Sequence, residues 1–224
     1  MNPWLKIPAE DYESHMSLPD VAQAQVLNAL MASTLKAHRP DSIAVMGCTT
    51  GNGFEHIDSS HTRRAIGVDI NRDYLISLRK RFAKRLPCLE LVEGDVASAD
   101  FKVGPVSLVF AGLIFEYVEV TDAINSMYRS MVPGGILLSV LQLPSPDSSP
   151  VTDTQFKSLA MLAPIMKLVS PSEFSKKCNS AGLQLINSDT IPLKKGKAFF
   201  VGIYQKPVDD SQDESLHFAS MPNW

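Results

Sequence analysis

The chemistry-bearing residues of this sequence gather at the ends of three short apolar runs, and the first run ends in a cluster of glycines. Residues 42–46 have the length of a buried strand, and Gly47, Gly51 and Gly53 follow them. Glycine lets a backbone turn sharply and approach a ligand without a Cβ atom in the way. Because the next helix would also present free N–H groups, we expect residues 47–53 to cradle a cofactor.

The second and third runs each lead to a carboxylate. Asp69 follows residues 65–68, at the distance from the glycine turn where an acidic side chain accepts hydrogen bonds from both hydroxyls of an adenosine ribose. Asp95 follows residues 89–92 and is placed to accept from the exocyclic amine of adenine. Three strand ends therefore converge on one nucleoside, and they predict an adenosine-like cofactor.

The glycine spacing bears on which adenosine cofactor this is. A dinucleotide-binding loop carries Gly-x-Gly-x-x-Gly, whereas here the glycines are Gly47, Gly51 and Gly53, with Thr49 where a glycine is expected. The spacing disfavours NAD and FAD. It also disfavours the alternative of a nucleotide-dependent dehydrogenase.

Strand and helix patterns alternate along the chain. Helical patterns include the segment between Ser17 and Pro40, a short one near residues 54–57, and residues 71–86 and 120–131. Residues 183–191 and 198–204 predict an antiparallel pair of strands. Alternation of this kind predicts an α/β fold, with a parallel sheet, right-handed crossovers and helices on both faces.

Together with residues 106–111, 114–118 and 131–138, these motifs resemble the class I S-adenosylmethionine-dependent methyltransferases over residues 40–206. The resemblance implies a Rossmann-like, seven-stranded, mostly parallel sheet that ends in the antiparallel C-terminal hairpin. It also implies S-adenosylmethionine as the cofactor and methyl transfer to a small-molecule acceptor.

Two departures from the family support an alternative function. The family usually has an acidic residue where this chain has Val45, and a glycine where it has Thr49. Both positions lie near the expected methionine end of the cofactor. The alternative is an S-adenosylmethionine-binding protein without transferase activity, which would serve as a sensor or a regulatory partner.

The resemblance also implies roles for individual residues. Residues 1–16, irregular by pattern, correspond to a segment that is often a lid in the family, so Tyr12 and His15 are candidates for the acceptor side, and a surface-docking arm is the other interpretation. Tyr12, His15, Glu116 and Tyr117 are the candidates for catalysis, although Glu116 can also simply hold the loop after the fourth strand. The expected cofactor contacts are Gly47, Cys48, Thr49, Gly51, Asp69, Ile70, Asp95, Val96, Ala111, Gly112 and Leu113.

Two later segments bear on the acceptor. Residues 142–152 are rich in Pro and Ser and predict a loop at the rim of the site, which either contacts the acceptor or only connects two elements. Residues 156–168 carry Met and Leu at helical spacing, which suits the core and would also suit an apolar acceptor.

Composition limits the remaining possibilities. The 224 residues are 45% apolar and fit one globular domain, and the net charge of −3 argues against a nucleic-acid-binding surface. Three scattered cysteines without a Cys-x-x-Cys pair indicate neither a metal site nor disulfides, and no run is long enough to span a membrane. We expect a cytoplasmic protein with an N-terminal lid and helix at 1–39, a cofactor-binding domain at 40–206 and a mobile acidic tail at 207–224.

Overall fold

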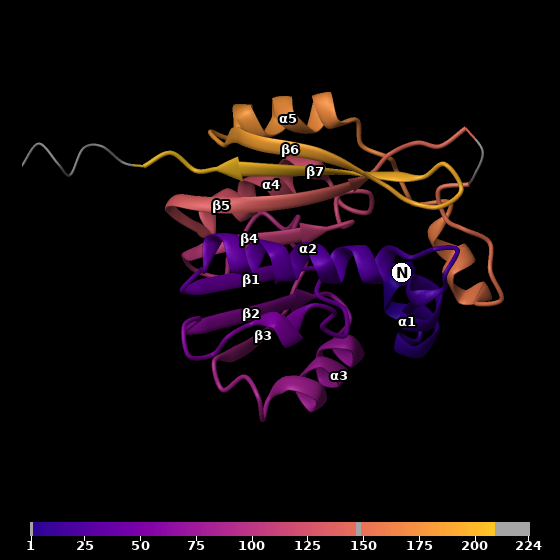
Figure 1. Ribbon diagram of the computed structural model, residues 1–224, viewed down its shortest axis with the longest axis horizontal. Helices are drawn as coiled ribbons and strands as arrows, with labels where there is room; N and C mark the ends of the chain where they lie inside the picture. The colour runs from indigo at the N-terminus through magenta and orange to yellow at the C-terminus, as the bar shows by residue number, and fades with distance from the viewer. Residues whose placement is uncertain (1, 147–148, 209–224) are drawn as a thin grey trace, which may run out of the picture.

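The computed structural model describes residues 2–146 and 149–208, so nearly all of the expected acidic tail lies outside the described residues. The described residues contain a seven-stranded sheet in the order β3-β2-β1-β4-β5-β7-β6 (Figure 1). Neighbouring strands are parallel except for β7, which runs antiparallel to β5 and β6. The predicted fold class is therefore confirmed. The strands are β1 Ser42–Met46, β2 Arg64–Asp69, β3 Leu89–Glu93, β4 Val106–Gly112, β5 Met131–Gln142, β6 Gln184–Pro192 and β7 Ala198–Gln205.

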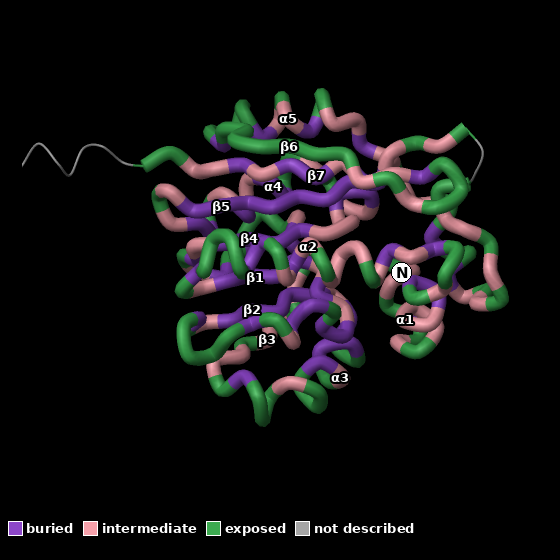
Figure 2. Tube along the Cα trace, viewed as in Figure 1, coloured by how far each residue is buried: buried purple, intermediate pink, exposed green. Residues whose placement is uncertain are grey.

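Helices cover both faces of this sheet, as predicted. Side chains of a strand alternate between its faces, and two buried clusters result. One cluster joins β1, β4 and β5 to α4 and α5, and the other joins the opposite face of these strands to α2 and α3. Figure 2 shows that β5 is buried along most of its length whereas the edge strand β6 is exposed. The helices are η1 Pro3–Lys6, α1 Ala9–Ser17, α2 Gln23–His38, η2 Phe54–His56, α3 Arg72–Phe82, α4 Val120–Arg129, η3 Lys157–Leu162 and α5 Pro171–Ser180.

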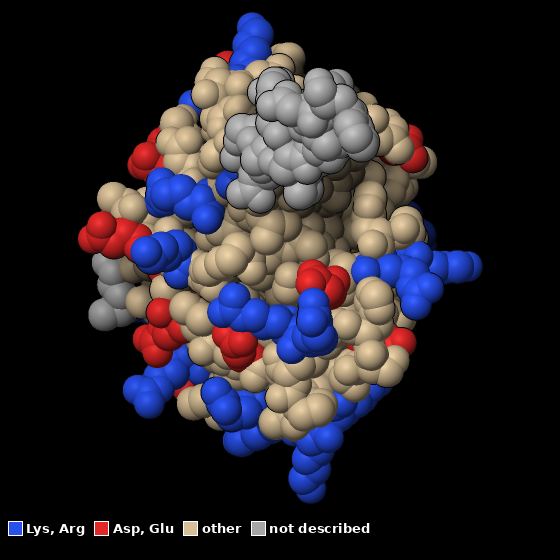
Figure 3. Space-filling view, turned by 90° about the vertical axis from the view of Figure 1, so that its left-hand side faces the viewer, with Lys and Arg blue, Asp and Glu red and all other residues tan. Residues whose placement is uncertain are grey.

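The strand order determines where a ligand can bind. From β1 the chain moves outward to β2 and β3, and it then crosses back to place β4 on the other side of β1. Open α/β sheets bind ligands beyond the carboxyl ends of the strands at such a reversal. The N-terminal segment and α1 lie at this end of the molecule (Figure 1). On the opposite end, Lys and Arg side chains are interspersed with Asp and Glu (Figure 3).

The prediction of an irregular N-terminal segment is wrong, because residues 3–6 form η1 and residues 9–17 form α1. Pro8 precedes the first turn of α1, where a missing backbone N–H costs no helical hydrogen bond, so it starts the helix rather than breaking it. Ser17 is the last residue of α1 and does not cap the following helix. That helix, α2, starts at Gln23 after Ala22, which adopts a left-handed conformation with φ of 54°.

Two other helical predictions are only partly correct. The helix after the glycine turn is a single 3₁₀ turn, Phe54–His56, and residues 156–168 contain only η3. In η3 the buried side chains are Leu159 and Leu162, which pack on Ile7 of the N-terminal segment. This small separate cluster, rather than the main core, explains the apolar spacing there.

Candidate functional site

A cavity of about 370 Å³ lies at the carboxyl ends of the parallel strands, where the strand order predicts it. One wall, which we call the cofactor half, consists of residues that follow β1 to β4. The opposite wall, the acceptor half, comes from α1, the first residue of α2, the end of β5, residues 150–152 and η3. Of the residues predicted to contact the cofactor, those that line the cavity are Gly47, Thr49, Asp69, Ile70, Asp95, Val96, Gly112 and Leu113.

Asp69 is a buried carboxylate at the centre of the cofactor half. Its Oδ2 accepts a hydrogen bond from the Thr49 backbone N–H at 2.9 Å, and its Oδ1 accepts from the Asn71 N–H at 2.8 Å. Burial raises the pKa of this carboxyl, and the backbone N–H groups oppose that effect. Each carboxylate oxygen keeps a further lone pair for a ligand. Asp95 is exposed on the same wall and accepts from the Ala97 N–H at 2.9 Å.

The glycines of the turn have two different roles. Gly47 lines the cavity with φ of +68°, and a Cβ atom there would lie 3.1 Å from the Ile114 side chain. Gly51 and Gly53 are not among the residues that line the cavity. A Cβ atom at Gly51 would meet Phe82 of α3 at 2.9 Å, and one at Gly53 would meet Met31 of α2 at 2.8 Å. The absence of a Cβ atom at the two later glycines thus lets helices pack against the turn, and the expected contact of Gly51 with the cofactor stays a prediction.

Three other predicted residues lie outside the cavity wall. Cys48 is buried in the cluster with α2 and α3, and burial together with Asp69 raises the pKa of its thiol. Ala111 is fully buried with its side chain in the cluster on the other face. Glu116 is buried behind the wall, so the structure does not bring it to the cavity with the other catalytic candidates.

Glu116 instead belongs to a buried polar chain beneath the acceptor half. Its Oε1 accepts from the backbone N–H of Gln142 at 2.7 Å, and its Oε2 has no hydrogen-bond partner among the described residues. Burial raises the pKa of this carboxyl to about 7. The Gln142 side chain accepts from Gln23 at 3.0 Å and donates to the Pro150 carbonyl at 2.8 Å. These hydrogen bonds hold Gln23 and Gln142, which are polar residues of the cavity lining.

Helix α1 is attached to three separate parts of the site. Glu13 accepts from the Thr50 hydroxyl in the glycine turn and from Arg81 of α3 at 2.8 Å. Asp11 accepts from the hydroxyl of Ser158 in η3. These contacts hold the N-terminal segment across the cavity in the described structure.

Aromatic contacts also join this segment to the residues that follow β4. Trp4 meets Tyr12 and Tyr117 edge-to-face, with ring centroids 5.9 Å and 5.0 Å away. The Trp4 carbonyl accepts from the Asn71 side chain at 2.9 Å, and the Ile7 carbonyl accepts from the Tyr74 hydroxyl at 2.9 Å. The segment is thereby joined to the start of α3, next to Asp69.

The three catalytic candidates that line the cavity, Tyr12, His15 and Tyr117, differ in how readily they accept a proton. Burial raises the pKa of Tyr12 to about 12 and also raises the pKa of Tyr117, so both phenols stay protonated near neutral pH. Burial and the charge of Lys197 lower the pKa of His15, which stays neutral there. The His15 Nδ1 lies 3.0 Å from the Thr154 hydroxyl. His15 is thus the candidate able to accept a proton.

Sequence reasoning missed two residues of this region. Trp4 lines the cavity, and Lys197 is buried against residues 150–152. An isolated aromatic residue or a lysine in a hairpin turn gives no periodic signal, so neither was recognisable. Among the described residues there is no group of His, Cys, Asp and Glu that could hold a metal ion, and no helix long and apolar enough to cross a membrane.

Comparison with known proteins finds a family match over the part of the chain that contains the cofactor half. Residues 43–135 match the family described as a methyltransferase domain. No curated protein matches the sequence.

Solved structures share the fold at low sequence identity. The N-methyltransferase NodS from Bradyrhizobium japonicum WM9, bound to S-adenosyl-L-homocysteine, is 13% identical with a TM-score of 0.64 and covers 92% of this chain and 100% of its own. The geranyl diphosphate C-methyltransferase from Streptomyces coelicolor A3(2) is 13% identical with a TM-score of 0.62, over 80% of this chain and 77% of that one. The [4+2]-cyclase SpnF is 11% identical with a TM-score of 0.65, over 81% and 82%.

Proposed function

The chain carries a methyltransferase domain on the fold of the class I S-adenosylmethionine-dependent methyltransferases, and we propose that it transfers the methyl group of S-adenosylmethionine to a small, largely apolar acceptor. The observation that carries this proposal is the cavity at the carboxyl ends of the strands. Its cofactor half presents the glycine and the two carboxylates that an adenosine cofactor needs, and the N-terminal segment covers it. The same fold also serves a cyclase, so the activity has to be tested directly.

The cofactor half fits S-adenosylmethionine, which supplies a methyl group on a positively charged sulfur when bound. Asp69 would accept from the ribose hydroxyls, Asp95 from the adenine amine, and Gly47 would leave room for the methionine end. The charged side chains that line the cavity in the described part of the chain are carboxylates, Asp69, Asp95 and Glu119, with no Lys or Arg. A negative lining of this kind favours a cofactor that carries positive charge.

The protein's main contribution to methyl transfer is positioning and the exclusion of water. Holding two reactants in line can lower a barrier by roughly 7–11 kcal/mol. Glu13 and Asp11 fasten α1 across the cavity, which would keep water from the reacting groups. We therefore assign residues 2–16 to a lid.

His15 is the base we assign if the acceptor has to lose a proton. With its Nδ1–H donating to the Thr154 hydroxyl, the Nε2 atom of the neutral ring can accept that proton. Tyr12 and Tyr117 retain their protons in this pH range, so they cannot act as the base, although their hydroxyls can hydrogen-bond to the acceptor. Glu116 acts through Gln142, as a positioning residue.

The acceptor half supports an apolar acceptor. Its lining includes Met16, Val151, Leu159, Leu162 and Met166, and the neutral amides of Gln23 and Gln142 are its main polar groups on the side of α2 and β5. Apolar walls with a few placed polar groups are typical of small-molecule sites.

Calorimetric titration with S-adenosylmethionine, S-adenosylhomocysteine and NAD tests the cofactor. We expect the first two to bind and NAD not to bind, and binding of NAD alone would contradict the proposal. Turnover then separates the enzyme from the binding protein of the alternative function. Transfer of an isotope-labelled methyl group to a panel of small apolar acceptors is the measurement, and it should be lost in His15→Gln if His15 is the base.

A further inference from the structure

Lys197 is a buried ammonium group at the edge of the acceptor half. Lys197 lies just before β7 and is 6% exposed. The Nζ atom donates to the Pro150 carbonyl at 3.1 Å and to the Thr152 hydroxyl at 2.8 Å. Both of these residues line the cavity. The same Pro150 carbonyl accepts from Gln142, so Lys197 lies directly behind the acceptor wall.

No carboxylate among the described residues forms an ion pair with Lys197. Two described acidic side chains of the adjoining segments have other partners, since Asp20 pairs with Lys195 at 2.7 Å and Asp153 pairs with Lys157 at 2.7 Å. Two titratable groups interact electrostatically with Lys197. Lys195 is positively charged and His15 is neutral near pH 7, so neither supplies a negative charge. Buried lysines are almost always paired, because burial of an uncompensated charge is costly.

The hydrogen-bond donors at this position are not all used. An ammonium group has three N–H donors, and the described residues account for two of them. The Thr152 hydroxyl accepts from Lys197, so its own O–H can donate to a ligand in the cavity that Thr152 lines. Burial and the charge of Lys195 lower the pKa of Lys197, which is the effect expected of a cation that lacks its counter-ion.

We infer that Lys197, with Thr152, binds an oxyanion of the methyl acceptor, so that the acceptor is an apolar acid whose carboxylate or phosphate lies at residues 150–152. Its apolar body would lie against Met16, Leu159 and Leu162 of the same half. This inference rests on the proposed function. The carboxylate of the methionine part of the cofactor is the other possible source of the same chemistry.

The test uses the full-length protein saturated with S-adenosylhomocysteine and two probes of equal chain length, octanoate and 1-octanol. A hydrogen bond to a charged group should make octanoate bind roughly ten- to a hundredfold more tightly, as measured by calorimetry. Lys197→Met keeps the length of the side chain and should abolish this preference, whereas Lys197→Arg should retain it. Octyl phosphate shows whether a phosphate is accepted as well as a carboxylate.

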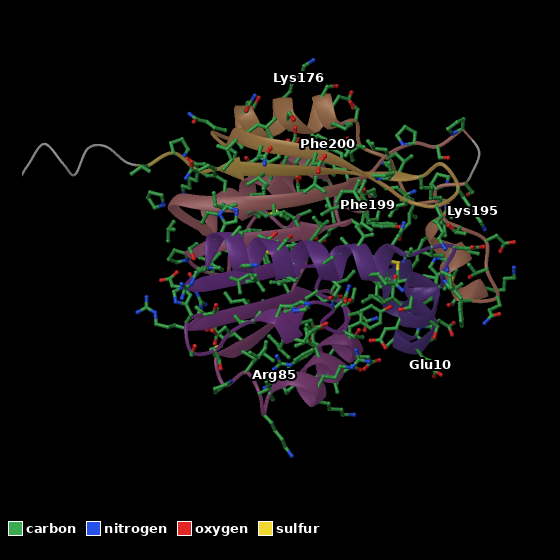
Figure 4. The ribbon with its side chains drawn as sticks, in the orientation of Figure 1. Glu10, Arg85, Lys176, Lys195, Phe199 and Phe200 are labelled. Atoms are coloured by element: carbon green, nitrogen blue, oxygen red, sulfur yellow. The ribbon has the colours of Figure 1, made fainter. Side chains whose placement is uncertain are left out.

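Lys194→Met is the matched control, because Lys194 is exposed in the same hairpin as its neighbour Lys195 (Figure 4) and is not one of the charges that shift the pKa of Lys197. It should leave the octanoate preference unchanged. Equal binding of octanoate and octanol to the wild-type protein would overturn the inference, even if Lys197→Met did not fold. A loss of S-adenosylhomocysteine affinity in a folded Lys197→Met protein would also overturn it, by assigning the anion to the cofactor. Failure of the wild-type protein to bind S-adenosylhomocysteine would instead reject the proposed function.

Discussion

The two halves of the cavity are built in different ways. The cofactor half comes from short turns directly after β1, β2, β3 and β4, and the sheet fixes the position of each turn. The acceptor half is assembled from segments far apart in the chain, namely residues 2–16, 150–152 and η3, and it has its own small apolar cluster around Ile7. The scaffold therefore determines one half, and long-range side-chain contacts determine the other.

The halves also differ in charge. Carboxylates of Asp69, Asp95 and Glu119 line the cavity, whereas the cation Lys197 lies behind residues 150–152. This separation suits two ligands of opposite charge, a cationic cofactor and an anionic acceptor. The comparison predicts that changes in each half affect different ligands.

Gly47→Val should have the largest effect on the cofactor half. The side chain would project toward Ile114 inside the cavity, at a φ of +68° that a branched residue adopts only with strain of about 1–3 kcal/mol. We expect cofactor binding to fall below detection by calorimetry while the protein stays folded. Gly104→Val is the control, because Gly104 has a similar φ of +77° away from the cavity and meets only the end of Arg64. Normal cofactor affinity in Gly47→Val would show that the cofactor binds elsewhere.

Removal of residues 1–16 should affect the acceptor half much more than the cofactor half. We expect turnover to be lost, because the lid carries Tyr12 and His15, while cofactor affinity falls only moderately because Asp69 and Asp95 remain. Hydrogen exchange of this segment in the intact protein should slow when S-adenosylhomocysteine is added. Unchanged exchange, together with full activity of the truncated protein, would identify the segment as a surface arm. Circular dichroism of the truncated protein checks that it remains folded.

Asp69→Ala should weaken cofactor binding less than Gly47→Val does. The ribose hydroxyls would lose a charged acceptor worth about 1.5–3 kcal/mol, so cofactor affinity should fall by roughly ten- to a hundredfold. Asp73→Ala removes an exposed carboxylate from the first turn of α3 and should leave the affinity unchanged. Octanoate binding should be the same in both variants. An equal loss in both would mean that only the general negative charge matters.

The sequence predicted the scaffold much better than the acceptor half, for a physical reason. Short apolar runs and helical patterns report which residues are buried, and they placed β1 to β4 and the acidic residues at the strand ends correctly. Gly51 and Gly53 were expected at the ligand because their type alone cannot distinguish a close approach to a ligand from one to α3 or α2. The roles expected of the site residues remain predictions until a ligand is bound.

The acceptor half depends on contacts with no local signature. The hydrogen bond between His15 and Thr154 joins residues 139 positions apart, and the contact of Lys197 with Pro150 joins the hairpin to a loop. Residues 1–16 were expected to be irregular, although Pro8, directly before the first turn of α1, is compatible with a helix that starts there. Only the folded chain shows that these residues meet.

Glu116→Gln should have the smallest effect, which falls on stability and on the support of the acceptor half. The folded-state pKa of Glu116, about 7, lies above its ordinary value of 4.5, so the folded protein holds this proton more tightly than the unfolded chain does. The resulting stabilisation is complete below pH 4.5 and is lost as the pH rises to 7 and above, by about 3 kcal/mol in total. Glutamine resembles the protonated carboxyl and can still accept from the Gln142 N–H, so the variant should lose this dependence and be the more stable protein at pH 8. Urea unfolding of both proteins at pH 5 and pH 8 measures the difference, with Glu119→Gln, which changes an exposed carboxylate on the same loop, as the control. If the wild-type protein and Glu116→Gln lose equal stability between the two pH values, Glu116 is ionised in the folded protein, and the buried chain to Gln142 is held by a charge instead of a proton.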